Sequence, residues 1–223
     1  MNKTLLSFTV IAALSIGANA MEKCAQGKYG GDTKKEMKTA MTKSYYKLND
    51  KGELIRPTDY RTWVYIGTPV TPNDLNGGHA AFPEMHNVYI DPESYKVYKE
   101  TGKFREGTII VKELVSVGAT QAVSGKGYFE GEFLGLEASV KSKKDFPKEP
   151  GNWAIFTFSD MKTGILKDSA PVMPSDKCVS CHQASASDDF VFTQYYPVLR
   201  AAKGFGKGNP EDTAKRAIQK MKK

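Results

Sequence analysis

The chain has 223 residues, of which 40% are hydrophobic, and a formal net charge of +7 at pH 7. This length is enough for one well-packed domain with terminal extensions and too short for two large domains. The charge alone does not predict nucleic-acid binding, because no aromatic and basic motif accompanies it. A solvated basic surface is the better interpretation of the excess lysines.

The first 20 residues have the pattern of an export signal. Lys3 supplies a positive charge, residues 5–16 form an apolar run, and Ala18-Asn19-Ala20 fits a signal-peptidase cleavage site. The alternative is a membrane anchor, but the run is shorter than the roughly 20 apolar residues that span a bilayer. We therefore predict cleavage near Ala20, no membrane span, and a mature protein in a bacterial periplasm.

The segment after the signal begins with a polar, lysine-rich N-terminal extension over residues 21–50. The pattern then changes. Residues 58–63 predict a short helical turn, residues 64–67 a strand, and residues 68–78 a loop rich in Pro, Asn and Gly. A second strand is expected over residues 87–90.

A helix is predicted next, since Asp91 can cap it, Pro92 suits its first turn and Gly102 can end it. The β-branched and aromatic residues that follow favour three antiparallel strands in a meander. These strands are expected over residues 107–117, 128–141 and 153–158. The pattern predicts a β-rich α+β fold, an antiparallel β-sheet meander with flanking helices.

The last part of the chain carries a cysteine motif on a predicted loop, then a helix-like stretch to residue 202 and a basic C-terminal tail over 204–223. Cys178-Val179-Ser180-Cys181-His182 matches C-x-x-C-H. This spacing lets two thiols add to the two vinyl groups of haem and places the adjacent imidazole under the iron as an axial ligand.

Two other interpretations of the motif are weaker. A thioredoxin-like redox pair would open a helix early in an α/β fold, whereas this pair lies late in a β-rich chain. A zinc site needs further ligands, and only His79 and His86 remain, far upstream. Cys24 stays unassigned, as a free thiol or a bridge between two chains. We predict covalent haem c on Cys178, Cys181 and His182.

The second axial position of the iron is not decided by the sequence. Candidate ligands are His79, Met85, His86 and the other methionines. A protein ligand there would favour electron transfer, whereas an open position would favour chemistry at the iron. Both interpretations stay open at this point.

Charged residues interrupt two of the predicted strands. Alternation places Lys112 on one face of its strand and Glu113 on the other, so at least one of them is expected to be buried or paired. In the next strand, Glu137 shares its face with Phe133 and Gly135 by the same rule. Ordinary solvated or salt-bridged positions are the alternative for Lys112 and Glu137.

Several blocks around these residues are similar to the cytochrome P-460 family, in the same order along the chain. The similarity covers roughly residues 49–203, so we expect a haem-binding domain over residues 51–203. The matching blocks are Pro92-Glu93-Ser94-Tyr95, Phe104 to Thr108, Val111 to Val115, Gly135 to Lys141, Glu149 to Trp153, and Phe192 with Tyr196 to Arg200.

The resemblance implies a β-rich homodimer, related to the β-type cytochromes c′, with an open distal face on its haem. It also implies a lysine crosslink to the haem macrocycle, which falls on Lys112, and a distal carboxylate that accepts protons, which falls on Glu137. The implied activity is oxidation of hydroxylamine to nitrous oxide or nitrite, with electrons passed to an external acceptor such as a soluble cytochrome c.

One position departs from the family's pattern. His86 stands where related sequences can carry a distal arginine, so we expect it to hydrogen-bond bound substrate or, as an alternative, to ligate iron. Phe82 is expected to form an aromatic wall of the distal side, with an ordinary core position as the alternative. Two rival functions stay open, a nitric-oxide-binding protein without turnover and an electron-transfer cytochrome c.

Overall fold

The computed structural model describes residues 43–160 and 163–202. The predicted export signal with its cleavage near Ala20, Cys24, most of the extension 21–50 and the tail 204–223 lie outside the described residues. In the described part, no helix is both long and apolar enough to cross a bilayer.

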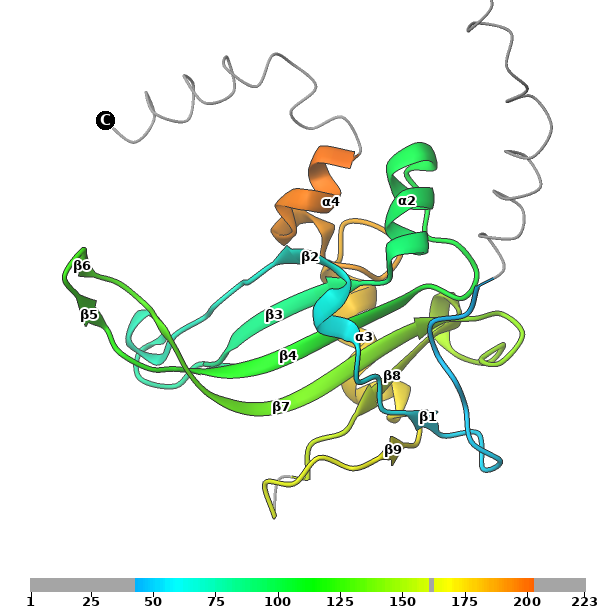
Figure 1. Cartoon of the computed structure of the whole chain (residues 1–223), viewed down its shortest axis with the longest axis horizontal. Coiled ribbons are helices and arrows are strands. Elements are labelled where there is room, and N and C mark those ends of the chain that lie inside the picture. The colour runs from blue at the N-terminus through cyan, green and yellow to red at the C-terminus, as the bar shows by residue number, and fades with distance from the viewer. Residues whose placement is uncertain (1–42, 161–162, 203–223) are drawn as a thin grey trace, which may run out of the picture. The chain divides into compact units, whose positions relative to one another are not determined.

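The core of the fold is a five-stranded antiparallel sheet with the order β2-β3-β4-β7-β8, shown in Figure 1. Neighbouring strands follow one another along the chain, apart from the small β5–β6 hairpin between β4 and β7, which confirms the β-rich α+β prediction of an antiparallel meander. The strands are β2 (Val64–Gly67), β3 (Met85–Ile90), β4 (Ile109–Val117), β5 (Gln121–Ala122), β6 (Gly125–Lys126), β7 (Glu130–Lys141) and β8 (Trp153–Thr157).

Short elements surround this sheet. β1 and β9 pair with each other as a separate two-stranded sheet. Helices α2 and α4 lie at the β2 side, and α3 lies behind the sheet in the view of Figure 1. The remaining bounds are β1 (Leu54–Ile55), η1 (Tyr60–Thr62), η2 (Asn73–Asn76), α2 (Pro92–Thr101), η3 (Pro150–Asn152), β9 (Ser169–Ala170), α3 (Ser175–Ser185), η4 (Thr193–Tyr195) and α4 (Pro197–Ala202).

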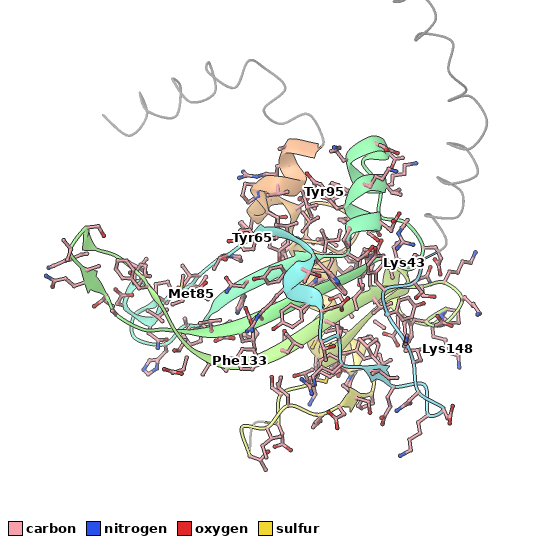
Figure 2. All side chains as sticks on the ribbon, viewed as in Figure 1. Lys43, Tyr65, Met85, Tyr95, Phe133 and Lys148 are labelled. Carbon is pink, nitrogen blue, oxygen red and sulfur yellow. The ribbon has the colours of Figure 1, made fainter. Side chains whose placement is uncertain are left out.

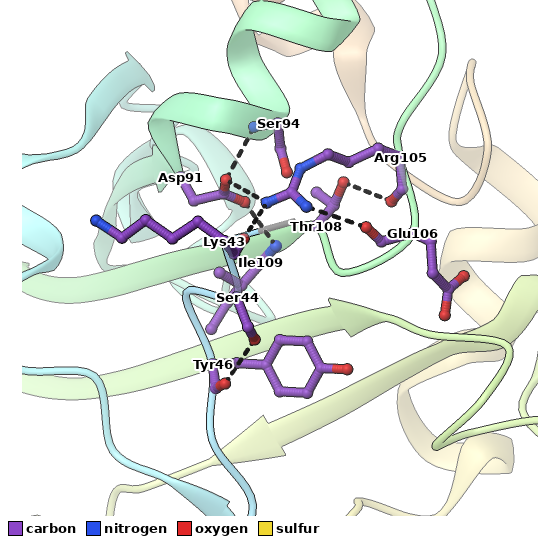
Figure 3. Close-up of polar contacts among 9 residues, drawn as sticks. All are labelled: Lys43, Ser44, Tyr46, Asp91, Ser94, Arg105, Glu106, Thr108 and Ile109. Atoms are coloured by element: carbon purple, nitrogen blue, oxygen red, sulfur yellow. Dashed lines mark hydrogen bonds and ion pairs between the residues drawn. The ribbon is translucent and has the colours of Figure 1, made fainter. Parts of the chain in front are cut away.

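The predicted ends of α2 are confirmed. Asp91 caps the helix by accepting a hydrogen bond from the Ser94 backbone N–H at 2.8 Å, and Gly102 ends it in the left-handed conformation. Asp91 is fully buried, and Figure 3 shows that its carboxylate also accepts from Arg105 and from the Ile109 backbone N–H. One carboxylate therefore joins the start of α2 to the start of β4.

The two faces of the sheet bury different sets of apolar side chains. One face packs against the segment that leads into η1; its core consists of Leu54, Tyr60, Trp63, Ile109, Val111, Leu136, Ala138, Val140, Phe146, Ala154, Phe156, Phe158 and Ala170. The other face packs under α2 and α4; its core consists of Ile66, Val88, Ile90, Tyr98, Phe104, Ile110, Trp153, Val191, Tyr196 and Leu199.

Two expectations about local structure were wrong. The cysteine motif lies on α3 rather than on a loop. Glu137 does not share its face with Phe133, because the pairing of β4 with β7 shifts register between Leu114 and Val115, which places Phe133 opposite Val115. Such a bulge adds a residue to one strand and breaks the alternation of side chains. Met85 opposes Val115 from the other side, so Met85 and Phe133 flank it in the half of the sheet nearer the β5–β6 hairpin (Figure 2).

Candidate haem-binding site

Helix α3 brings the three residues of the cysteine motif together. Cys178, Cys181 and His182 are spaced i, i+3 and i+4, which places all three on one face of a helix. Cys178 is half-buried and Cys181 is exposed, and both are free thiols. Burial raises the pKa of Cys178 above its ordinary value, with the negative charge of Glu137 adding to this shift. A pair of free thiols at this spacing on one face of a helix is the arrangement that covalent attachment of haem c requires.

His182 is already oriented by a hydrogen bond. Its Nδ1 donates to the backbone carbonyl of Phe190 at 2.8 Å, and its ring lies 4.8 Å from the ring of Phe192. With the proton held on Nδ1, the other ring nitrogen, Nε2, carries the lone pair that a metal would bind. Burial lowers the pKa of His182, which favours the neutral ring. The donor set of two thiols and one oriented imidazole therefore fits haem c.

Lys112 and Glu137 form an ion pair on the sheet. They face each other across β4 and β7, and Lys112 Nζ lies 2.6 Å from Glu137 Oε2. Both side chains are partly exposed, at 29% and 30%. Their charges shift the pKa values of Cys178 and His182, so the pair and the cysteine motif belong to one electrostatic environment.

Of His79, Met85 and His86, only His86 lies on the same face of the described sheet as Lys112. His86 opposes Leu114 and Val88 opposes Lys112, whereas Met85 belongs to the opposite face because it opposes Val115. His79 is exposed in the loop after η2. The described strands therefore place His86, but not Met85, beside the ion pair.

The surroundings of His86 are polar on one side and aromatic on the other. Its Nε2–H donates to Glu84 Oε1 at 3.2 Å, and the ring of Phe82 lies 6.4 Å away in an edge-on orientation. Phe82 is 61% exposed, so in the isolated chain it is an open edge of the site rather than an enclosed wall. Glu84 also lines a cavity of about 1010 Å³ between the loop before β3 and the β5–β6 hairpin.

The other charge predicted to be buried or paired, Glu113, is both. Only 4% of Glu113 is exposed, and it accepts hydrogen bonds from Tyr60 at 2.8 Å and from the Arg61 guanidinium. It lies on the face opposite to Lys112 and is far better satisfied. Glu113 therefore ties the sheet to η1, whereas Lys112 pairs with Glu137 on the other face.

Comparison with known proteins identifies the family. The sequence pattern of the cytochrome P460 family matches residues 57–193, which is more than half of the chain and includes the motif on α3. The chain belongs to the cytochrome P460 family. A comparison with curated proteins gave no match.

Membership of the cytochrome P460 family supports a haem-binding cytochrome. The site also contains groups that the sequence did not predict. Glu84 was missed, although its i, i+2 spacing to His86 on an extended segment was a usable signal. The Phe190 carbonyl gave no signal, since a backbone acceptor does not depend on the residue type.

The pKa of His86 in this cytochrome P460 predicts a pH effect on stability. Burial, and then the charge of Lys112, lowers it below its ordinary value of 6.5, and the bond to Glu84 offsets this only in part. Because the unfolded chain then binds the proton first, the free energy of unfolding should fall as the pH drops below about 6.5 towards the folded-state pKa.

We expect the His86→Asn variant to lack the part of the acid-induced fall in unfolding free energy that comes from His86. Denaturant titrations of both proteins at pH 7.5 and pH 5.0 measure it, as a smaller drop in unfolding free energy for the variant. An equal drop in the two proteins would mean that His86 is not held neutral.

Proposed function

We propose that this cytochrome P460 is a periplasmic haem c enzyme that oxidises hydroxylamine and passes the electrons to an external acceptor. The observation that carries the proposal is the Lys112–Glu137 ion pair, 2.6 Å long, within electrostatic reach of His182. A protein that only binds a gas needs neither an amine for a crosslink nor a base at this position. Both groups have a use in an oxidation that releases protons.

The residues that would hold the haem are Cys178, Cys181 and His182, with Lys112 as a further covalent link. Haem bound there would supply the redox centre that takes electrons from the substrate nitrogen. Lys112 Nζ is the only one of these groups that comes from the sheet rather than from α3. A link through Lys112 would therefore fix the macrocycle from two directions.

Glu137 would act as the base. Its carboxylate lies beside Lys112 and is partly exposed, so it can accept a proton from a small substrate and return it to water. His86, whose Nε2–H is directed at Glu84, would accept a hydrogen bond from the substrate through Nδ1. Glu137 on β7 would thus accept the proton released by hydroxylamine and, being 30% exposed, would pass it to solvent.

The partners in this proposal are small or soluble. A soluble redox protein such as a cytochrome c would take the electrons, and the basic surface would suit an acidic partner. The chain would act as a homodimer after export and signal cleavage. Nitrous oxide or nitrite would be the product.

The absorption spectrum tests the lysine link. We expect the reduced wild-type protein to show a strongly red-shifted Soret band, and Lys112→Ala to return that band to the position of an ordinary high-spin haem c with the haem still attached. Lys96→Ala, at an exposed position of α2, is the control and should leave the spectrum unchanged.

Each outcome of this measurement separates the candidate functions. A wild-type spectrum that is high-spin but not red-shifted would favour a nitric-oxide-binding protein, and sharp low-spin bands would favour an electron-transfer cytochrome. An identical spectrum in wild type and Lys112→Ala would remove Lys112 from the site.

A further inference from the structure

Left-handed backbone conformations gather at one place beside α3. Among residues 43–160 and 163–202, the non-glycine residues with positive φ are Asn152 (60°), Asp189 (44°) and Phe190 (62°). Asn and Asp adopt this region several-fold more readily than other residues, whereas for a bulky residue such as phenylalanine it is an outlier. Strain of this kind persists only where the surroundings hold it, and it is concentrated at functional sites.

Two turns with this conformation pack against each other. Gly151 also has a positive φ of 61°, and a Cβ on it would collide with the ring of Phe190. The phenylalanine ring therefore rests on bare backbone, which only glycine provides. The Gly151–Asn152 turn thus supports the Asp189–Phe190 turn.

A single ammonium group ties the two turns together. Lys141 Nζ donates to the Gly151 carbonyl at 3.1 Å and lies 2.9 Å from Asp189 Oδ2. Its side chain is 19% exposed, and it lies over the ring of Trp153 at 5.4 Å. Lys141 comes from the end of β7, the strand that carries Glu137.

The other side of the turn is fixed to the core. The hydroxyl of Tyr98, a fully buried residue of α2, donates to Asp188 Oδ2 at 2.7 Å. The Val191 backbone N–H closes the turn on the Asp188 carbonyl at 2.8 Å. Phe190 is therefore held from both ends, with its carbonyl directed at His182 Nδ1.

We propose that Lys141 is a positioning residue for the axial histidine. Its contacts with Asp189 and Gly151 hold the strained turn so that the Phe190 carbonyl keeps its bond to His182. This inference rests on the proposed haem at His182. Such a bond makes the imidazole a stronger donor, which favours the oxidised metal and lowers the reduction potential.

The test uses the haem-loaded protein with Lys141→Met, which removes the charged amine and keeps an unbranched side chain of nearly the same length. We expect the reduction potential to rise and the iron–histidine stretching band of the reduced protein to move to lower frequency. Lys141→Arg, which can keep both contacts, should restore most of both values. Lys148→Met is the control, at an exposed lysine in the loop after β7 (Figure 2), and should change neither.

The outcomes separate this inference from the proposed function. A Lys141→Met protein with wild-type potential and stretching band would overturn the inference and leave the proposed function intact. If that variant does not mature, Asp189→Gly removes the carboxylate that Lys141 contacts with a residue that tolerates the left-handed conformation, and an unchanged potential there would overturn it as well. Wild-type protein without covalent haem would overturn both.

Discussion

Replacing Glu137 with glutamine is expected to lower the kcat of hydroxylamine oxidation by about 10²- to 10⁴-fold, the usual contribution of a positioned acid or base. Glutamine has nearly the same shape as glutamate but cannot accept a proton at neutral pH. Lys112 Nζ loses its charged partner 2.6 Å away, yet its place on β4 is set by backbone pairing. The loss should therefore fall on turnover and not on haem attachment.

The measurement is steady-state oxidation of hydroxylamine with an artificial electron acceptor, together with the absorption spectrum of each protein. Glu132→Gln is a matched control, since Glu132 is an exposed carboxylate on the same strand. An unchanged kcat for Glu137→Gln, with the wild-type spectrum, would remove Glu137 from the chemistry. A changed spectrum would instead show that the carboxylate acts by holding Lys112.

Local signals in the sequence predicted the main elements of the fold well. Three residues predicted the ends of α2, each for a physical reason: the cap Asp91, the proline after it and Gly102. The helix begins and ends at these residues. The sequence shows runs of β-branched and aromatic residues separated by connecting segments. Strands that follow one another in this way usually pair with each other, and in the sheet they do. The family assignment rested on blocks in these strands, in α2 and in the segments near α4, and it is confirmed.

The individual residues of the candidate site could be predicted from the sequence, but their arrangement in space could not. Lys112 and Glu137 stood out as charges in apolar strands, but their pairing depends on the register of β4 against β7. That register includes a bulge near Leu114, and no residue pattern in the sequence predicts it. Alternation alone therefore failed at Phe133, although it succeeded at Lys112, where the strand is regular.

Contacts that depend on the tertiary fold left no trace in the sequence. Glu113 is bound by Tyr60 and Arg61, more than 50 positions earlier in the chain. The acceptor for His182 is a carbonyl that is aimed by a strained turn and not by a side chain. In both cases the contact forms only because the fold brings separate segments of the chain together.

The largest effect on stability is expected from Asp91→Ala. Its buried carboxylate accepts from the Ser94 N–H at 2.8 Å, the Ile109 N–H at 3.0 Å and the Arg105 guanidinium at 3.1 Å, as Figure 3 shows. Alanine would leave all three donors without this acceptor, and Arg105, whose side chain is 10% exposed, would keep an unpaired charge. Breaking a buried ion pair from one side typically costs about 3–5 kcal/mol.

Chemical denaturation of the variants measures this loss. Asp59→Ala is the control, because Asp59 precedes η1, is exposed and makes no capping hydrogen bond with its side chain; its change should stay within about 0.5 kcal/mol. Asp91→Asn should fall between the two, since an amide oxygen can still cap α2 but cannot pair with Arg105. A loss below about 1 kcal/mol for Asp91→Ala would contradict this assignment.

The Asp91 carboxylate also affects the candidate site, because it binds the backbone of β4. Ile109, whose N–H it holds, is the first residue of β4 and lies three positions before Lys112. If that end of β4 loosens, the pairing that places Lys112 opposite Glu137 should loosen with it. Asp91→Asn should therefore lower turnover more than Asp59→Ala does, even at a temperature where both variants are fully folded, and equal turnover would show that the register of β4 is fixed by the sheet alone.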